Sequence, residues 1–318
     1  MNLKELYRKA IKIGIKNDPR SEKTVLGELK KNKNKYEELK KKEKEFFDKE
    51  SLENPYSDSR ILNGSGDETI KTVLVGIDIE VGELILADIL RNRGKQIDAV
   101  IAHHPEGLPY AMLYDVMKMQ ANILSLHGVP INVAESLMEH RVKEVQRRLM
   151  PINHTRAVDA ARLIGLPFMN LHTPADNMVA TYLQRLFDKE EPCTMNEVVS
   201  MLLEIEEYKQ AAMNGAGPNI LIGSKERSAG KIFIDMTGGT EGSKDIFKML
   251  LASDINTIVC MHLSEDHRKE AEKNHLNVII AGHIASDNLG LNLMFDRLLL
   301  DPKINVIECS GFRRVKRK

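Results

Sequence analysis

The chain has 318 residues, of which 42% are hydrophobic, and its 46 basic side chains balance its 46 acidic ones. This composition is sufficient for a packed core and excludes wholesale disorder, and the length predicts roughly two domains. No apolar run approaches the roughly 18 residues that span a bilayer, and the charged N-terminus has no signal-peptide core. We therefore expect a cytoplasmic protein without a membrane partner.

The balanced charge conceals an acidic body with two basic ends. Residues 1–60 carry 17 basic and 12 acidic side chains, and the last eight residues carry five basic ones, which leaves 24 basic and 34 acidic side chains in residues 61–310. We interpret the ends as solvated helix faces and a soluble tail, so nucleic acid is not an expected partner. The three cysteines lie far apart and form no CxxC pair, which fits a reducing compartment.

The pattern predicts helices over residues 1–50, a loop at 54–58, and an alternation of strands and helices from residue 70 onward. Short β-branched runs predict strands at 70–78, 97–102, 129–134, 167–172, 218–223, 231–236, 257–262, 277–283 and 304–310. Helical patterns cover 81–94, 108–127, 135–149, 154–164, 176–188, 194–209, 241–252, 264–275 and 287–300. This alternation is typical of an α/β fold with parallel strands.

Histidines and aspartates follow the carboxyl ends of three predicted strands. His103 and His104 directly follow 97–102. His172 ends 167–172 and His283 ends 277–283, and each is followed four residues later by an aspartate, Asp176 and Asp287 respectively. Ligands of open α/β sheets bind beyond these strand ends, and a spacing of four residues puts imidazole and carboxylate on one helix face. Such donors favour Zn, Mn, Fe or Co. A single histidine at a strand end is more often a structural residue held by a hydrogen bond than a metal ligand, so spacing alone leaves both interpretations open.

Four motifs occur in a characteristic order, and they are AHHPEG (102–107), LHTPAD (171–176), TGGTEG (237–242) and AGHIASD (281–287). This set resembles the NIF-three-like family, named for NGG-one-interacting factor three and also labelled GTP cyclohydrolase I type 2 homologues. The resemblance implies a two-lobed α/β fold with mixed and parallel sheets flanked by helices. We predict a helical N-terminal extension at 1–58, a first lobe at 59–214, and a second lobe with a basic tail at 215–318.

The resemblance also implies two divalent metal ions (Zn, Fe or Mn) between the lobes, and a homo-oligomer that is a hexamer in the family. It assigns the metal ligands to His103, His104, Asp176, His283 and Asp287. It places His172 beside the metals, where its simplest role is to orient Asp176. Asp287 stands where the family has Glu, and its shorter side chain leaves monodentate, water-mediated or weaker ligation open. Three imidazoles and two shared carboxylates leave open metal positions, which is typical of catalytic sites.

Several further residues have two interpretations. The turn at 237–243 precedes a predicted helix, and its backbone N–H groups either bind a substrate or anion or simply form a tight turn that requires positive φ. The residues in question are Gly238, Gly239, Thr240, Gly242 and Ser243. Glu106 is either a proton shuttle or a surface residue. His262 could line the same cleft, whereas His267 is expected to be solvated.

The expected function is that of a metal-dependent hydrolase acting on a small molecule of the nucleotide-like or phosphorylated kind, with GTP cyclohydrolase-type activity as one candidate. No catalytic residue is assigned. The alternative is a non-catalytic metal chaperone or a regulatory interaction protein. The N-terminal 60 residues and the helices at 135–164 are additions relative to compact family members, and either could cover the cleft or alter the assembly.

Overall fold

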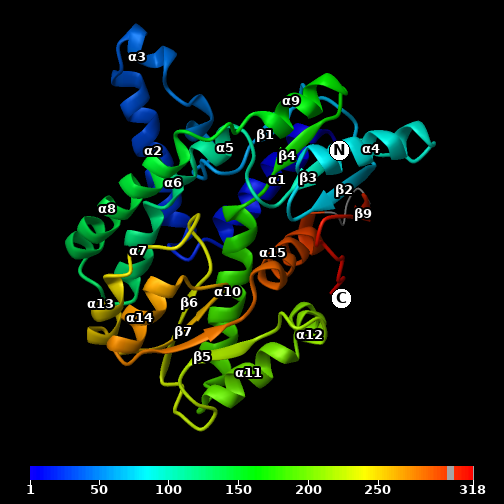
Figure 1. Cartoon of the computed structure of the whole chain (residues 1–318). Coiled ribbons are helices and arrows are strands. Elements are labelled where there is room, and N and C mark those ends of the chain that lie inside the picture. Colours follow the sequence, from blue (N-terminus) through cyan, green and yellow to red (C-terminus); the bar gives the residue numbers. More distant parts are fainter. Residues whose placement is uncertain (299–303, 318) are drawn as a thin grey trace.

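The computed structural model describes residues 1–298 and 304–317, which form two mixed sheets flanked by helices (Figure 1). The strands are β1 (Ile61–Asn63), β2 (Thr72–Gly76), β3 (Ala99–Ala102), β4 (Phe168–Asn170), β5 (Asn219–Ile222), β6 (Lys231–Asp235), β7 (Ile255–Cys260), β8 (Asn277–Ile280) and β9 (Asn305–Glu308). The first sheet has the order β1-β4-β3-β2-β9 and the second has the order β5-β8-β7-β6. β1 and β5 pair antiparallel with their neighbours, and the other pairs are parallel. The predicted α/β fold is confirmed.

The helices cover both sheets, and a short 3-10 helix, η1 (Lys49–Leu52), ends the N-terminal extension. They are α1 (Leu3–Lys16), α2 (Glu22–Glu38), α3 (Lys41–Glu45), α4 (Val81–Asn92), α5 (Leu108–Ala111), α6 (Leu113–Val116), α7 (Met119–Leu126), α8 (Ile131–Leu149), α9 (Arg156–Leu163), α10 (Thr173–Glu190), α11 (Met195–Leu203), α12 (Glu206–Met213), α13 (Ile246–Ala252), α14 (Glu265–Lys273) and α15 (His283–Leu298). None of the described helices combines the length and the apolar character that a membrane crossing requires.

The strand β2 shows why its sequence becomes a central strand. All five of its residues are buried, and successive side chains of a strand point to opposite faces. Val73 and Val75 belong to one hydrophobic cluster, and Leu74 between them belongs to another. A continuous β-branched and aliphatic run therefore fits a parallel strand with a core on each face.

The helices α10 and α15 pack against each other between the two sheets (Figure 1). α10 follows β4 of the first sheet, and α15 follows β8 of the second. After α15 the chain returns to the first sheet, where β9 pairs in parallel with β2. The C-terminal strand thus lies in a different sheet from β5 to β8. The two helices bring the carboxyl ends of strands from both sheets to one place.

The N-terminal extension is part of the hydrophobic core. The helix α1 contacts both α10 and α15, whereas α2 and α3 project from the body (Figure 1). After α1, the buried pair Asp18–Arg20 accepts a hydrogen bond from the hydroxyl of Tyr56 at Asp18 Oδ2 (3.0 Å). The amide of Asn177 donates to the same Tyr56 hydroxyl at 3.1 Å. Because Asn177 lies on α10, this network ties the extension to that helix.

We expect Gly14→Ala to lower the free energy of unfolding by about 1–3 kcal/mol, because added methyl groups strain a packed core. A Cβ on Gly14 would lie 2.7 Å from Pro174 Cβ and 2.8 Å from Pro174 Cα, at the start of α10. Gly27→Ala on α2 is the matched control, since a Cβ there meets no atom within 4 Å. Urea unfolding of both variants measures the difference. Equal stability of the two variants would contradict the close packing of α1 on α10.

The structure differs from the predicted elements at several places, and the predicted helix at 108–127 is divided into α5, α6 and α7. The predicted strand at 129–134 is wrong, because Pro130 caps α8 and Ala134 begins the buried stripe of that helix. The short strand β1 lies within a stretch where no strand was predicted. The predicted helix at 287–300 begins earlier, at His283, and its last two positions, 299 and 300, lie outside the described residues.

The expectation of a soluble C-terminal tail is wrong for Arg314 and Arg317, whereas Arg313 and Lys316 are exposed as expected. Arg314 forms an ion pair with Asp296 on α15, and Arg317 forms one with Glu207 on α12. The acidic body thus provides partners for the basic end, which the charge pattern alone did not show. The last residue, Lys318, lies outside the described part of the chain.

Candidate metal centre

The candidate ligands converge at the junction of the two sheets. His103 and His104 directly follow β3, and Asp176 lies in the first turn of α10. His283 is the first residue of α15, and Asp287 lies one turn further along the same helix. The strand-end pattern predicted this convergence, and the structure brings all five side chains together. Their role as metal ligands stays a prediction.

Asp287 is at the centre of the group. Its Oδ1 lies 3.4 Å from Nε2 of His103, and its Oδ2 lies 3.4 Å from Nε2 of His104 and 3.6 Å from Nε2 of His283. Asp176 Oδ1 lies 3.3 Å from the same Nε2 of His103. The two oxygens of Asp287 therefore face different imidazoles, a geometry that a carboxylate shared by two ions requires.

The imidazoles of His103 and His104 are oriented by contacts on their other nitrogens. Nδ1 of His103 lies 3.1 Å from the carbonyl oxygen of Leu171, and Nδ1 of His104 lies 2.6 Å from Oδ1 of Asp78. An acceptor at Nδ1 retains the proton on that nitrogen, so Nε2 of a neutral ring presents a lone pair. Metal-binding histidines commonly have this arrangement.

Unpartnered polar atoms show that the cluster fits a cation. Among the described residues, six buried side-chain polar atoms lack a hydrogen-bond partner. Four of them belong to this cluster, namely Nε2 of His103, Oδ1 of Asp176 and both oxygens of Asp287. Donors about 2.1 Å from a tetrahedral metal lie about 3.4 Å from one another, close to the separations found here. The cluster could hold a metal ion.

The pKa shifts of the metal-free cluster are also those expected of a cation site. Burial opposes protonation of His104, but Asp287 and Asp78 outweigh it and raise the pKa of this imidazole to about 9. Burial likewise opposes protonation of His103, whose pKa the two aspartates raise well above its usual value. Burial disfavours the charged form of Asp287, yet His103 and His104 hold its pKa far below the usual range. In the metal-free cluster, protonated His103 and His104 therefore supply the positive charge beside the carboxylates. Metal uptake would release these protons.

The comparison with solved structures finds proteins of similar fold. A NIF3 superfamily protein from Sphaerobacter thermophilus is 27% identical and superposes with a TM-score of 0.70, over 80% of this chain and 91% of that one. The chain is thus similar in sequence and in fold to a NIF3 superfamily protein, as its motifs predict. Reduced HcgD from Methanocaldococcus jannaschii and TTHA1606 from Thermus thermophilus are each 14% identical. They cover 79% and 80% of this chain and 87% and 89% of their own, with TM-scores of 0.47 and 0.46. No family model matches the sequence, and no curated protein does.

A cavity of about 400 Å³ adjoins the candidate metal centre. Its lining includes three histidines of the cluster, His104, His172 and His283, and also Tyr110 and Arg156. Such a volume lies in the range of small-molecule sites. The candidate ligands therefore open onto a space that a substrate could occupy.

Glu106 also lines this cavity. Burial, reinforced by the carboxylates of Glu80 and Asp78 and opposed by Arg156, raises its pKa to about 7. Glu106 is therefore not fully exposed to solvent. Its role as a proton shuttle stays a prediction.

The turn at 237–243 packs against the first half of the chain. The Gln120 side chain on α7 donates to the carbonyl oxygens of Gly238 and Thr240, both at 2.7 Å. Gly238 and Gly239 have φ of +94° and +93°, as a tight turn predicts. The turn does not open a helix directly, since α13 begins only at Ile246. The turn therefore does not present the free N–H groups of a helix N-terminus to an anion. Substrate contact by these residues stays a prediction.

A second polar cluster lies on the far side of His283. The ring of His262 lies 4.9 Å from that of His283, and Glu241 Oε1 lies 3.4 Å from Nδ1 of His262. Burial would raise the pKa of Glu241, but His262 and His267 lower it to about 2. The expectation that His267 is solvated is wrong, because its Nε2 lies 3.0 Å from the carbonyl oxygen of Gly242 in a buried position.

The ionisation of Asp235, near this second cluster, makes the stability of the folded chain depend on pH. Burial, opposed by His267 and reinforced by Glu241, raises the pKa of Asp235 to about 6 from 3.8. The folded chain therefore retains a proton that the unfolded chain has lost, so stability falls as pH rises from about 4 to about 6. We expect Asp235→Asn to raise the free energy of unfolding by about 1–2 kcal/mol at pH 8 and to leave it nearly unchanged at pH 4. Urea titrations at both pH values test this, and an equal effect at both would contradict it.

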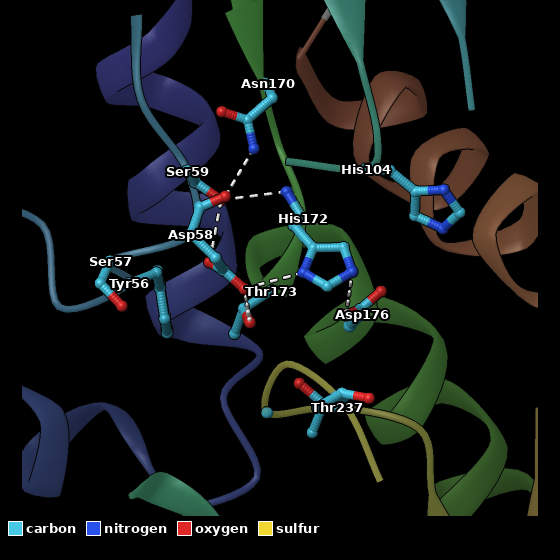
Figure 2. Close-up of polar contacts among 12 residues, drawn as sticks. Tyr56, Ser57, Asp58, Ser59, His104, Asn170, His172, Thr173, Asp176 and Thr237 are labelled. Atoms are coloured by element: carbon cyan, nitrogen blue, oxygen red, sulfur yellow. Dashed lines mark hydrogen bonds and ion pairs between the residues drawn. The ribbon is translucent and has the colours of Figure 1, made fainter. Parts of the chain in front are cut away.

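Sequence reasoning missed the acceptors that orient the histidines. Asp78 follows β2, so the strand-end argument that found His103 and His104 could also have found Asp78. Asp58 lies in the stretch predicted as a loop, and its carboxylate contacts Nδ1 of His172 at 2.8 Å (Figure 2). Neither its spacing nor its neighbours in the sequence indicate that contact.

Proposed function

We propose that the protein holds two divalent ions of Zn, Fe or Mn at His103, His104, Asp176, His283 and Asp287, and acts as a metal-dependent hydrolase. The observation that carries the proposal is the set of four unpartnered, buried donor atoms at the junction of the sheets. Bound divalent ions would supply a Lewis acid and an activated water for hydrolysis. The chain itself supplies oriented donors and an adjoining cavity.

The cavity supports a phosphorylated or nucleotide-like substrate. Arg156 lines it and forms no ion pair with any residue that the structure describes, so its guanidinium is available to a phosphate. Tyr110 lines the same cavity and offers an aromatic face. Gly239 and Thr240 line the wall next to His262. GTP is one candidate substrate, by resemblance to the family label.

The test is metal analysis followed by a substrate screen. The chain is purified without a metal-affinity tag, its bound metals are measured by mass spectrometry, and phosphoesters and GTP are assayed with Mn, Fe and Zn restored. Two ions per chain, with turnover that His104→Ala abolishes and Arg156→Ala weakens through KM, support the proposal. Tight metal binding without turnover, but with transfer to an acceptor apoprotein, supports the alternative metal chaperone. A wild-type chain without metal, with a melting temperature that chelators do not change, overturns both.

We also propose a homo-oligomer, a hexamer by resemblance to the family. The helix α4 exposes Ile85, Leu86 and Ile89, each more than 40% accessible, which supports an apolar assembly surface. Light scattering of the wild type and of Ile89→Glu tests this. A monomeric wild type overturns it.

A further inference from the structure

His172 shares the orientation of the two histidines that follow β3. Its Nδ1 faces the Asp58 carboxylate at 2.8 Å, as Nδ1 of His104 faces Asp78 and Nδ1 of His103 faces a backbone carbonyl. An acceptor at Nδ1 again leaves the lone pair on Nε2 of the neutral ring. Figure 2 shows this ring between Asp58 on one side and Asp176 on the other. All three imidazoles thus have Nδ1 occupied and Nε2 free to bind a cation.

The ligand atoms of these three histidines lie close together. One donor atom from each of His103, His104 and His172 falls within 4.8 Å of the others. The ring centroid of His172 lies 5.0 Å from that of His103 and 5.9 Å from that of His104. This grouping shares His104 with the one formed by His104, His283 and Asp287, and His103 also belongs to a third grouping with Asp176 and Asp287.

A purely orienting role for His172 does not fit the distances. Its Nε2 lies 3.7 Å from Oδ2 of Asp176, which is too long for a hydrogen bond. A ring that positions Asp176 would need that bond. His172 is itself the residue that is held in position, by its ring contact with Asp58 and by its backbone N–H, which donates to Ser59 Oγ at 2.9 Å.

Asp58 is built to hold this ring. It is fully buried, and it accepts a hydrogen bond from the hydroxyl of Thr173 at 2.6 Å in addition to its contact with His172. The Ser59 hydroxyl lies 3.3 Å from its other oxygen. Burying a carboxylate is costly unless such partners surround it, and the contacts with His172, Thr173 and Ser59 meet this requirement at Asp58.

We propose that His172 is a direct ligand of the metal centre, the sixth ligating side chain, and that Asp58 is its positioning residue. This inference rests on the metal centre under Proposed function. It replaces the role predicted for His172, from orienting Asp176 to binding the ion. It also makes the segment that joins the N-terminal extension to β1 part of the metal site.

The experiment uses cobalt as a spectroscopic probe of the full-length chain. Metal-free wild type, His172→Ala, Asp58→Asn and the exposed control His140→Ala are titrated with Co²⁺, and the visible absorption bands and the Kd from chelator competition are recorded. We expect His172→Ala to shift the bands and to weaken one cobalt site by more than about 100-fold, beyond the 10–100-fold loss typical of a residue outside the ligand shell. Asp58→Asn should lose about 10–100-fold with wild-type bands. Added imidazole should restore the bands of His172→Ala.

The outcomes separate the two proposals. Wild-type bands and a Kd within about threefold of the wild type in His172→Ala overturn the ligand role while leaving the metal centre intact. A wild-type chain that takes up no cobalt overturns the metal centre itself. If the circular dichroism spectrum of metal-free His172→Ala differs from the wild type, His172→Gln is measured in its place, and unchanged bands in that variant overturn the role of His172.

Discussion

Replacing Asp287 with asparagine should remove most of the bound metal. The carboxylate is 1% exposed, and its two oxygens face three imidazoles at 3.4–3.6 Å. An amide carries no charge and offers one weaker donor oxygen, so both ions would lose their shared ligand. Since residues outside a ligand shell already contribute 10–100-fold to affinity, we expect a loss of more than about 100-fold. Mass spectrometry of the purified variant and chelator competition measure it.

Two companion variants sharpen this test. Asp266→Asn on α14 removes an exposed carboxylate, 75% accessible, and should keep the wild-type metal content. Asp287→Glu restores the residue type that the family has at this position and should preserve or raise occupancy. A large fall in Asp287→Glu would show that the site is built around the shorter side chain. Wild-type metal content in Asp287→Asn would exclude Asp287 as a ligand.

Replacing Gly290 with alanine should separate the two helices that carry the carboxylates. A Cβ at Gly290 on α15 would lie 2.5 Å from the carbonyl oxygen of Ala175 on α10, and this atom belongs to the backbone and cannot rotate away. Asp176 follows Ala175 directly, and Asp287 lies one turn before Gly290. We expect the free energy of unfolding to fall by about 2–3 kcal/mol, at the upper end of overpacking effects. Metal affinity should fall with it, because the two carboxylates move apart.

The matched control is Gly82→Ala on α4. A Cβ there meets no atom within 4 Å, so this variant should be neutral or slightly stabilised, as alanine is favoured over glycine in a helix. Urea unfolding and cobalt titration of both variants give the two readouts. Wild-type stability and affinity in Gly290→Ala would show that the helix crossing does not determine the geometry of the site.

The sequence was most informative where local pattern decides structure. The β-branched runs at 70–78 and 97–102 predict parallel strands, since only a strand buried on both faces uses such continuous apolar residues. It was least informative at 129–134, where a similar apolar run starts a helix because Pro130 and the later apolar spacing outweigh β-propensity.

For the site, local periodicity is enough to predict which histidines and aspartates stand at strand ends and helix starts. Which acceptor orients each ring depends on contacts between distant parts of the chain. Asp58 and His172 are 114 residues apart, and Asp78 and His104 are 26 apart, so no local pattern links them. Similarly, the basic C-terminal end was visible in the composition, but its ion pairs with Glu207 and Asp296 depend on packing across the chain. Side-chain partners at such separations are set by how helices and sheets pack, which local periodicity does not encode.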